Sequence, residues 1–276
     1  MPSVSMLGQI AEDAPTYLLV AVRCFALVMT MPFFAARTFP RIVKVAFAGY
    51  IAFLMFPHVD FSSYVRFFEP NGGISLSFIL LLVGEGAIGV ILGLFVAILF
   101  AAFSSAGQFF SFQMGFSASE VYDALSQVEN PLMGQFFNLI AMLVFLHNDW
   151  AQLIFSHGLE SSFDSLNALS LVASREKIVQ FLLAGLTRLF ADAFLIALPL
   201  VGTLMLVSIT MGILSKAAPQ MNLLSEGFPV MILLSFLTIW TLLGDSNFGF
   251  IRFFEQSFLS GLRSLGRLFA ASRGGA

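Results

Sequence analysis

Six apolar stretches of uneven length alternate with more polar segments along this chain. They cover residues 17–34, 43–56, 74–103, 136–146, 178–214 and 228–243. A helix that crosses the ~30 Å hydrocarbon core of a membrane needs about 20 residues. The second, fourth and sixth stretches are short for this task, and the third and fifth are longer than it requires. The pattern predicts an all-α membrane protein whose helices are not a regular set of spans.

The pattern changes after residue 243, where apolar side chains recur at steps of three and four. They are Ile251, Phe254, Phe258, Leu262, Leu265 and Phe269. Arg252, Glu255, Arg263 and Arg267 fall on other faces. This spacing predicts an amphipathic helix that lies at a membrane interface or against partner helices. Residues 147–177 are polar enough to predict an extramembrane connection between a larger first part and a smaller second part.

Composition supports the membrane class. Of the 276 residues, 58% are hydrophobic and 11% are charged, whereas a soluble domain carries about 25% charged residues. Phe occurs 34 times against 4 Tyr, so most aromatic rings lack a hydrogen-bonding group and suit lipid or helix contacts. A net charge of −3 with scattered basic residues makes nucleic acid a poor partner. Residues 1–15 have no basic start, so we expect them to belong to the mature protein.

The charges between the apolar stretches give contradictory orientations. Arg37, Arg41 and Lys44 share the first connection, which the positive-inside rule places in the cytoplasm, with both termini then outside. Yet residues 252–273 carry four arginines, while residues 104–135 carry three acidic residues and no basic one. The conflict favours helical hairpins packed into a larger assembly, although a single misassigned span would also produce it.

Signatures of catalysis are missing from the sequence. No phosphate-binding loop and no G-x-S-x-G elbow is present, and His58, His147 and His157 are not at metal-ligand spacing. The single cysteine, Cys24, cannot form an internal disulfide. We therefore expect no enzymatic activity, no metal and no cofactor.

Four ionisable residues lie inside apolar stretches, namely Arg23, Glu85, Arg188 and Asp192. Such groups are costly in a membrane and must face protein or water. Arg188 and Asp192 are spaced i,i+4 and can neutralise each other as a structural pair. Arg23 and Glu85 are expected to pair with each other or with another subunit, and a proton-relay role for Glu85 is the alternative.

Small residues recur at steps of four after Glu85, at Gly89, Gly93, Ala97 and Ala101. A ridge of small residues lets a second backbone approach closely, which is how membrane helices associate. The spacing does not distinguish a partner helix from a packing face within the same chain.

Residues 107–117 are rich in Phe and are bracketed by glycines. Large apolar side chains on a glycine-hinged loop can close a pore by excluding water. From spacing alone, packing in an ordinary core is the favoured explanation.

The ordered set of motifs resembles the FliR family of flagellar export proteins and its virulence-secretion relatives, the SctT group. The motifs that carry the resemblance are Arg23 with Pro32 and Pro40, Gly84-Glu85 with the small-residue ridge, the Gln113-Met114-Gly115 centre, Ala197-Leu198-Pro199-Leu200, and Gly212-Ile213-Leu214 leading through 218–222 to Gly227-Phe228-Pro229. They extend from residue 23 to residue 243 in the family's order.

The resemblance implies a channel-forming subunit of a type III export gate without catalysis. It implies a FliP-like part at 1–150, a polar connection at 151–177, a FliQ-like hairpin at 178–243, and an amphipathic helix with tail at 244–276. The implied partners are FliP-like, FliQ-like, FlhB-like and FlhA-like proteins and unfolded secreted substrates. The implied place is the bacterial inner membrane at the flagellar basal body, with much of the complex on the periplasmic side.

The resemblance also implies a plug that closes the channel, which reverses the preference for ordinary core packing. Its residues would be Phe109, Phe110, Phe112, Met114 and Phe116, with Gly107 and Gly115 as hinges. The turn at Pro219, Gln220 and Met221 is implied to face the cytoplasm near the FlhB-like protein. A virulence secretion homologue and an ion-coupled transporter remain the alternatives.

Overall fold

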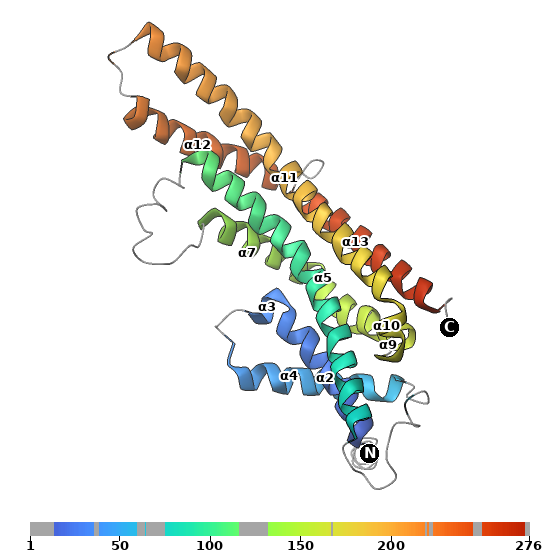
Figure 1. Cartoon of the computed structure of the whole chain (residues 1–276). Helices are drawn as coiled ribbons and strands as arrows, with labels where there is room; N and C mark the ends of the chain where they lie inside the picture. The colour runs from blue at the N-terminus through green and yellow to red at the C-terminus, as the bar shows by residue number, and fades with distance from the viewer. Residues whose placement is uncertain are drawn as a thin grey trace. The chain divides into compact units, whose positions relative to one another are not determined.

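The computed structural model describes residues 14–35, 39–59, 64, 75–115, 132–166, 168–218, 220, 223–244 and 250–273. Every regular element among these residues is helical, and no strand occurs among them (Figure 1). The all-α class expected from the hydrophobic pattern is therefore confirmed.

The helices follow the apolar stretches of the sequence closely. They are α2 (Ala14–Thr30), α3 (Pro32–Ala35), α4 (Arg41–Met55), η1 (Phe56–His58), α5 (Leu76–Met114), α7 (Leu132–His147), α8 (Trp150–Leu153), the π-helix η4 (Ile154–Gly158), α9 (Leu159–Ser165), α10 (Ala168–Ala173), α11 (Arg175–Ala217), α12 (Leu223–Gly244) and α13 (Phe250–Arg273). The first stretch is divided between α2 and α3, because Pro32 cannot supply the N–H group that a continuous helix needs.

Helix lengths are uneven, as the sequence predicts. In the part of the chain that the structure describes, Arg41–His58, Leu76–Met114 and Arg175–Ala217 are long and apolar enough to cross a membrane. The segments Leu132–His147 and Trp150–Ser165 qualify only together, as a broken span or a re-entrant loop. α5 has 39 residues and α11 has 43, so each is about twice as long as a bilayer requires.

The chain divides into two compact units. Unit 1 comprises Met1–Ala97, Asp149–Ala184 and Gly261–Ala276, and unit 2 comprises Ile98–Asn148 and Gly185–Ser260. Because α5, α11 and α13 each contribute to both units, the units do not coincide with the four consecutive parts expected from the sequence. The relation of those parts to FliP and FliQ stays a prediction.

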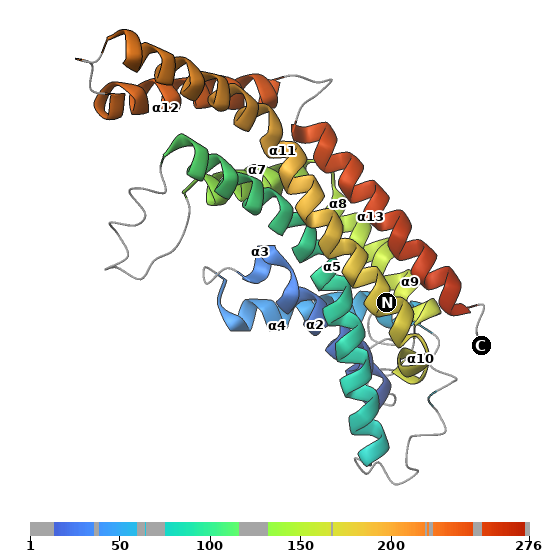
Figure 2. The same ribbon diagram turned by 45° about the horizontal axis from the view of Figure 1, so that its top comes forward.

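In unit 1, α2 and α4 form an antiparallel pair and lie side by side (Figures 1 and 2). The hydroxyl of Tyr17, at the start of α2, donates to the Gly49 carbonyl at 3.1 Å, and the Tyr17 ring lies 5.9 Å from that of Phe56, just after α4. The ring of Phe34, in α3, lies 5.0 Å from that of Phe47. The buried face of α4 includes Ala48, Ile51 and Ala52.

α5 packs closely against α2 through two of the four small residues in the ridge. A Cβ atom on Gly89 would overlap the carbonyl oxygen of Arg23, and one on Gly93 would overlap the Thr30 side chain. Ala97 and Ala101 are half-buried. For Gly89 and Gly93, the ridge is thus a packing face within the chain.

The polar segment at 147–177 is folded, and its place outside the membrane stays a prediction. It folds into α8, η4, α9 and α10, and it buries Ile154, Leu159, Ser162 and Leu166. The buried Ser162 has hydrogen-bond partners within unit 1, namely Arg23 and the Leu159 carbonyl.

In unit 2, the core is built from T-shaped contacts between phenylalanine rings. Phe254 of α13 lies 4.5 Å from Phe103 and 5.7 Å from Phe100, and Phe258 lies 5.6 Å from Phe145. The amphipathic helix is therefore confirmed, but Phe254 and Phe258 pack on α5 and α7 of the same chain. This corrects the expected placement of its apolar face at a membrane interface or on partner helices.

Candidate functional site

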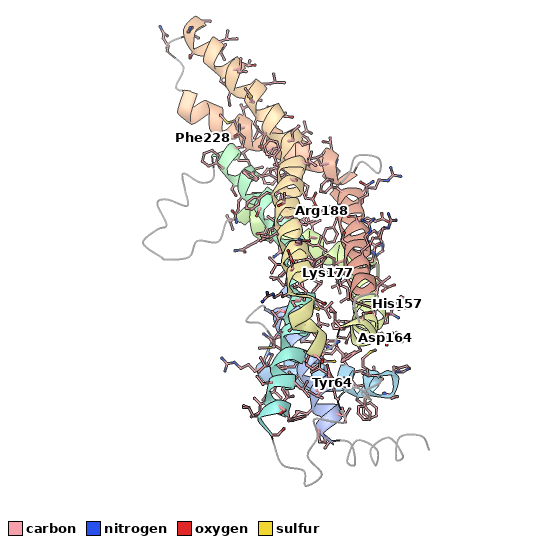
Figure 3. All side chains as sticks on the ribbon, turned by 45° about the vertical axis from the view of Figure 1, so that its right-hand side comes forward. Tyr64, His157, Asp164, Lys177, Arg188 and Phe228 are labelled. Atoms are coloured by element: carbon pink, nitrogen blue, oxygen red, sulfur yellow. The ribbon has the colours of Figure 1, made fainter. Side chains whose placement is uncertain are left out.

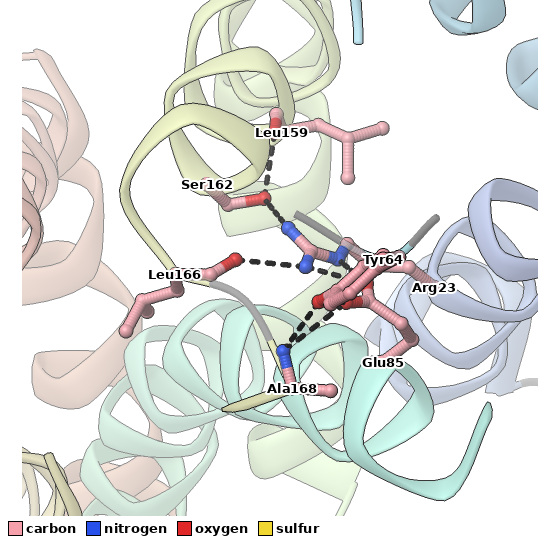
Figure 4. A network of polar contacts seen from close by, with 7 residues as sticks. All are labelled: Arg23, Tyr64, Glu85, Leu159, Ser162, Leu166 and Ala168. Atoms are coloured by element: carbon pink, nitrogen blue, oxygen red, sulfur yellow. Dashed lines mark hydrogen bonds and ion pairs between the residues drawn. The ribbon is translucent and has the colours of Figure 1, made fainter. Parts of the chain in front are cut away.

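A buried ion pair joins α2 to α5 in unit 1. Arg23 and Glu85 are both almost completely buried, and Arg23 Nε donates to Glu85 Oε2 at 2.6 Å (Figure 4). Of the alternatives that the sequence leaves open, pairing within the chain is the one observed. The close approach of the helices at Gly89 brings Arg23 beside α5.

The rest of the Arg23 guanidinium is held by the helical segment after α8. Nη1 donates to Ser162 Oγ at 3.0 Å, and Nη2 donates to the Leu166 carbonyl at 2.9 Å. The guanidinium carbon also lies 4.1 Å from the centre of the Phe163 ring, at a distance that gives a favourable cation–π interaction.

Both oxygens of the Glu85 carboxylate are occupied. Oε2 accepts a hydrogen bond from Arg23 Nε. Oε1 accepts from the Tyr64 hydroxyl at 2.5 Å and from the Ala168 N–H at 3.3 Å. Burial raises the pKa of the Tyr64 phenol above its usual value of 10.0, and the Glu85 carboxylate adds to the shift. Tyr64 therefore stays protonated and continues to donate. The arrangement fits a structural cross-link better than a proton relay, which needs an acceptor that is accessible to water.

The sequence did not reveal Tyr64, Ser162 or Ala168 as members of this network. Ala168 is 83 residues from Glu85, and Ser162 is 139 residues from Arg23. The available signal was weak, since it consisted of one Tyr in a polar segment and one Ser in an apparent connection.

The Phe-rich segment lies at the end of α5 in unit 2. The structure corrects its expected loop conformation, because the helix continues through Gly107 to Met114. A glycine within a helix costs about 1 kcal/mol relative to alanine. Here its lack of a side chain permits close packing, since a Cβ atom on Gly107 would lie 2.5 Å from the Met133 carbonyl oxygen and 2.6 Å from Gly134 Cα.

The five residues expected in the plug do not share one environment. Phe110 and Met114 are fully buried, and the Phe110 ring lies 4.6 Å from that of Phe137. Phe109 is 42% exposed and Phe112 is 73% exposed. Phe116 lies outside the described residues. Of the four that can be placed, only Phe109 and Phe112 present their rings on the surface of this chain.

Gly115 ends the helix and needs to be a glycine. Its φ of 83° is left-handed, a conformation that suits glycine at the end of a helix. A Cβ atom there would also collide with the ring of Phe228, which Figure 3 places on α12 near the end of α5. Whether Gly107 or Gly115 acts as a hinge stays a prediction.

A second ion pair, between Arg188 and Asp192 on α11, confirms the pairing that their i,i+4 spacing predicts. Arg188 is labelled on α11 in Figure 3. Its Nε lies 3.6 Å from Asp192 Oδ2, and Ser257 Oγ donates to the same oxygen at 2.9 Å. The Arg188 side chain is 41% exposed. This pair therefore belongs to the surface of unit 2, and its carboxylate is held by both α11 and α13.

The remaining expected site is a turn of which little is described. Gln220 is exposed in a turn between α11 and α12, and Pro219 and Met221 lie outside the described residues. Within the described part of the chain, no three His, Cys, Asp or Glu side chains are grouped so that they could hold a metal ion.

Uneven apolar helices and buried, paired charges place this chain among the helical membrane proteins. The described part of the chain shows no evident reaction centre. The family model described as "Bacterial export proteins, family 1" matches residues 14–258. The chain belongs to this family, which confirms the resemblance drawn from its motifs.

Curated relatives agree with the family match over most of their length. The flagellar biosynthetic protein FliR of Bacillus subtilis is 31% identical over 235 residues, which cover 84% of this chain and 88% of the relative. FliR of Borreliella burgdorferi is 31% identical over 226 residues, or 82% and 81% of the two chains. The surface presentation of antigens protein SpaR of Shigella sonnei is 29% identical over 180 residues, or 64% and 69%.

Proposed function

We propose that this chain is a channel-forming subunit of the flagellar type III export gate. In this role it assembles with FliP-like and FliQ-like subunits in the bacterial inner membrane, and unfolded flagellar proteins pass through the assembly. The observation that carries the proposal is the family match from residue 14 to residue 258, together with FliR relatives aligned over more than four-fifths of their length.

The exposed apolar surface supports a subunit of an assembly. α11 exposes Leu183, Phe190 and Phe194 on its first half and Leu206 and Ile213 on its second. This helix is about twice as long as a bilayer is thick, so lipid alone cannot cover its whole apolar length. Companion helices would cover the part beyond the lipid, which fits a complex that extends to the periplasmic side.

The exposed end of α5 supports a role in closing the channel. Phe109 and Phe112 lie one helical turn apart and project from a rigid helix whose other face is packed in unit 2. Two rings on such a support can meet equivalent apolar groups of neighbouring subunits and exclude water from a constriction. Phe110 and Met114 then serve as the anchor of this end rather than as the seal.

Co-purification and transport assays test the subunit role. An affinity-tagged copy expressed from its own chromosomal locus should retain FliP-like and FliQ-like subunits in stoichiometric amounts, and deletion of its gene should stop secretion of flagellar proteins. FlhB-like and FlhA-like proteins should associate with the same complex. A chain that purifies alone and transports a small solute in liposomes would instead indicate an ion-coupled transporter.

The similarity to SpaR supports a second candidate, a virulence type III secretion system. The same deletion distinguishes the two candidates. Loss of motility and of secreted flagellar subunits identifies the flagellar system, whereas normal motility with loss of other secreted proteins identifies the virulence system.

A further inference from the structure

The end of α5 is held in unit 2 by two sets of contacts. Phe110 and Met114 are fully buried, and the Phe110 ring packs on Phe137 of α7. The second contact is made by Phe228, which is labelled on α12 in Figure 3. Its ring lies so close to Gly115, where α5 ends, that a Cβ atom on Gly115 would collide with the ring atoms Cδ1 and Cε1. Phe228 therefore covers the end of α5 from another helix.

The last turns of α5 also carry a buried hydroxyl group that is not satisfied. Ser111 is 2% exposed, and among the side chains that the structure describes its Oγ is a buried atom without a hydrogen-bond partner. Other helical serines of unit 2 donate to the carbonyl four residues earlier, as Ser208 does to Leu204 and Ser235 does to Met231. A buried polar group without a partner is unfavourable. A displaced α5 end would let the Ser111 hydroxyl reach water or a carbonyl group, so the packed position carries a penalty.

α12 is weakened directly after Phe228. Pro229 lies inside this helix, and because proline has no N–H group, the second turn lacks one backbone hydrogen bond and can bend. Further along α12, Ser235 and Ile239 are buried, so that part of the helix is fixed in unit 2. A bend at Pro229 would move Phe228 while the rest of α12 stays in place.

We propose that Phe228 is a positioning residue, which keeps the end of α5 packed so that Phe109 and Phe112 close the channel. Bending of α12 at Pro229 withdraws the Phe228 ring, and the unsatisfied Ser111 hydroxyl then favours displacement of the α5 end. The inference rests on the proposed function, because it assigns the control of the seal that Phe109 and Phe112 form.

Ion conductance of the assembled gate in a planar lipid bilayer, at equal assembly yield, tests this role. Phe228→Ala should raise the leak about tenfold, which corresponds to ~1.4 kcal/mol less stabilisation of the packed position. Phe228→Met keeps a flexible apolar side chain and should restore a nearly closed channel. Gly115→Ala, whose methyl group would displace the Phe228 ring, should leak as Phe228→Ala does. It tests the contact even if Phe228→Ala fails to assemble.

Removal of the Ser111 hydroxyl separates positioning from a merely structural role. Ser111→Ala removes the unsatisfied group from the packed position, so Phe228→Ala/Ser111→Ala should leak several-fold less than Phe228→Ala. Ser208→Ala is the matched control, because it removes a helical hydroxyl that already has a partner. Phe228→Ala/Ser208→Ala should leak as much as Phe228→Ala. A general loss of packing would not distinguish the two serines.

Parental conductance of Phe228→Ala and Gly115→Ala in complexes of parental composition would overturn the inference and leave the proposed function intact. An unsuppressed leak in Phe228→Ala/Ser111→Ala, or equal suppression by Ser208→Ala, would also overturn it. Loss of assembly in both Phe228→Ala and Gly115→Ala would do the same, because Phe228 would then serve assembly. If the parent chain retains no FliP-like and FliQ-like subunits, the proposed function fails and the inference fails with it.

Discussion

Arg23 and Glu85 place two opposite charges in the buried interior of unit 1. Removing each ion from water costs several kcal/mol. The cost is offset because the charges meet at hydrogen-bonding distance and because Tyr64, Ser162, Leu166 and Ala168 satisfy their remaining polar atoms. The pair therefore depends on the whole network, and loss of one charge should be worse than loss of both.

Single and double substitutions test this interdependence. We expect Glu85→Gln to lower the free energy of unfolding by about 3–5 kcal/mol, because it leaves the Arg23 charge buried without a counter-ion. The double variant Arg23→Met/Glu85→Gln should recover much of this loss, since it buries no charge and keeps an acceptor for Tyr64. Thermal or denaturant unfolding in mild detergent measures both quantities. Strictly additive effects of the two substitutions would contradict the paired arrangement.

Sequence reasoning could identify the charged half of this network but not the polar half. An ionisable residue within an apolar stretch stands out because burying its charge among apolar residues is energetically unfavourable. Tyr64 and Ser162 do not stand out, because they lie in polar segments where such residues are ordinary. Their importance arises only when the chain brings them to Arg23 and Glu85.

At the scale of elements, the contact between α2 and α5 depends on the missing side chain of Gly89. We expect Gly89→Ala to destabilise the protein by about 1–3 kcal/mol, because the added methyl group would press on the α2 backbone. Gly202→Ala on α11 is the matched control, since nothing lies within 4 Å of its Cβ position. The control should leave stability unchanged or raise it by about 0.5–1 kcal/mol. Comparing the unfolding curves of the two variants tests the contact, and equal stabilisation would rule it out.

The apolar face of α13 provides a second test at this scale. Phe254→Ala should cost about 3–5 kcal/mol, because the ring is fully buried against Phe100 and Phe103. Leu259→Ala on the same helix should cost less than about 1 kcal/mol, since Leu259 is exposed. Proteolysis of α13 in the folded protein provides the measurement. The first variant should be cleaved faster than the parent and the second at the parental rate, and equal rates for the two variants would refute the packing described.

Hydrophobic periodicity predicted the long helices well, since each apolar stretch lies largely within them. The loop expected at residues 107–114 came from the resemblance and not from the spacing, which favoured packing in an ordinary core. The segment is helical because Gly107 allows α7 to approach and Phe110 packs on Phe137. These packing contacts arise in the tertiary structure, so the helix propensities of the residues cannot predict them. At 147–177, polarity predicted a connection between two parts but gave no sign of the short helices that form there or of the burial of Ser162.

At the scale of the whole molecule, the chain leaves a large apolar surface uncovered. The exposed residues on α4, α11 and α12 include Ile42, Leu206, Ile213, Leu233 and Trp240. Lipid can cover helices over about 30 Å of their length, and protein must cover apolar surface that lies beyond this. Membership of a bacterial export family fits a chain whose surface is completed by other subunits.

Conductance of the assembled gate in a planar lipid bilayer is the most direct test of the proposed seal. The parent complex should be closed to ions, whereas a complex with Phe109→Ala/Phe112→Ala should show a several-fold larger leak at the same assembly yield. Phe236→Ala removes a ring of similar exposure on α12 and should remain closed. If the double variant stays at the parental baseline in an intact complex, these two rings do not close the channel.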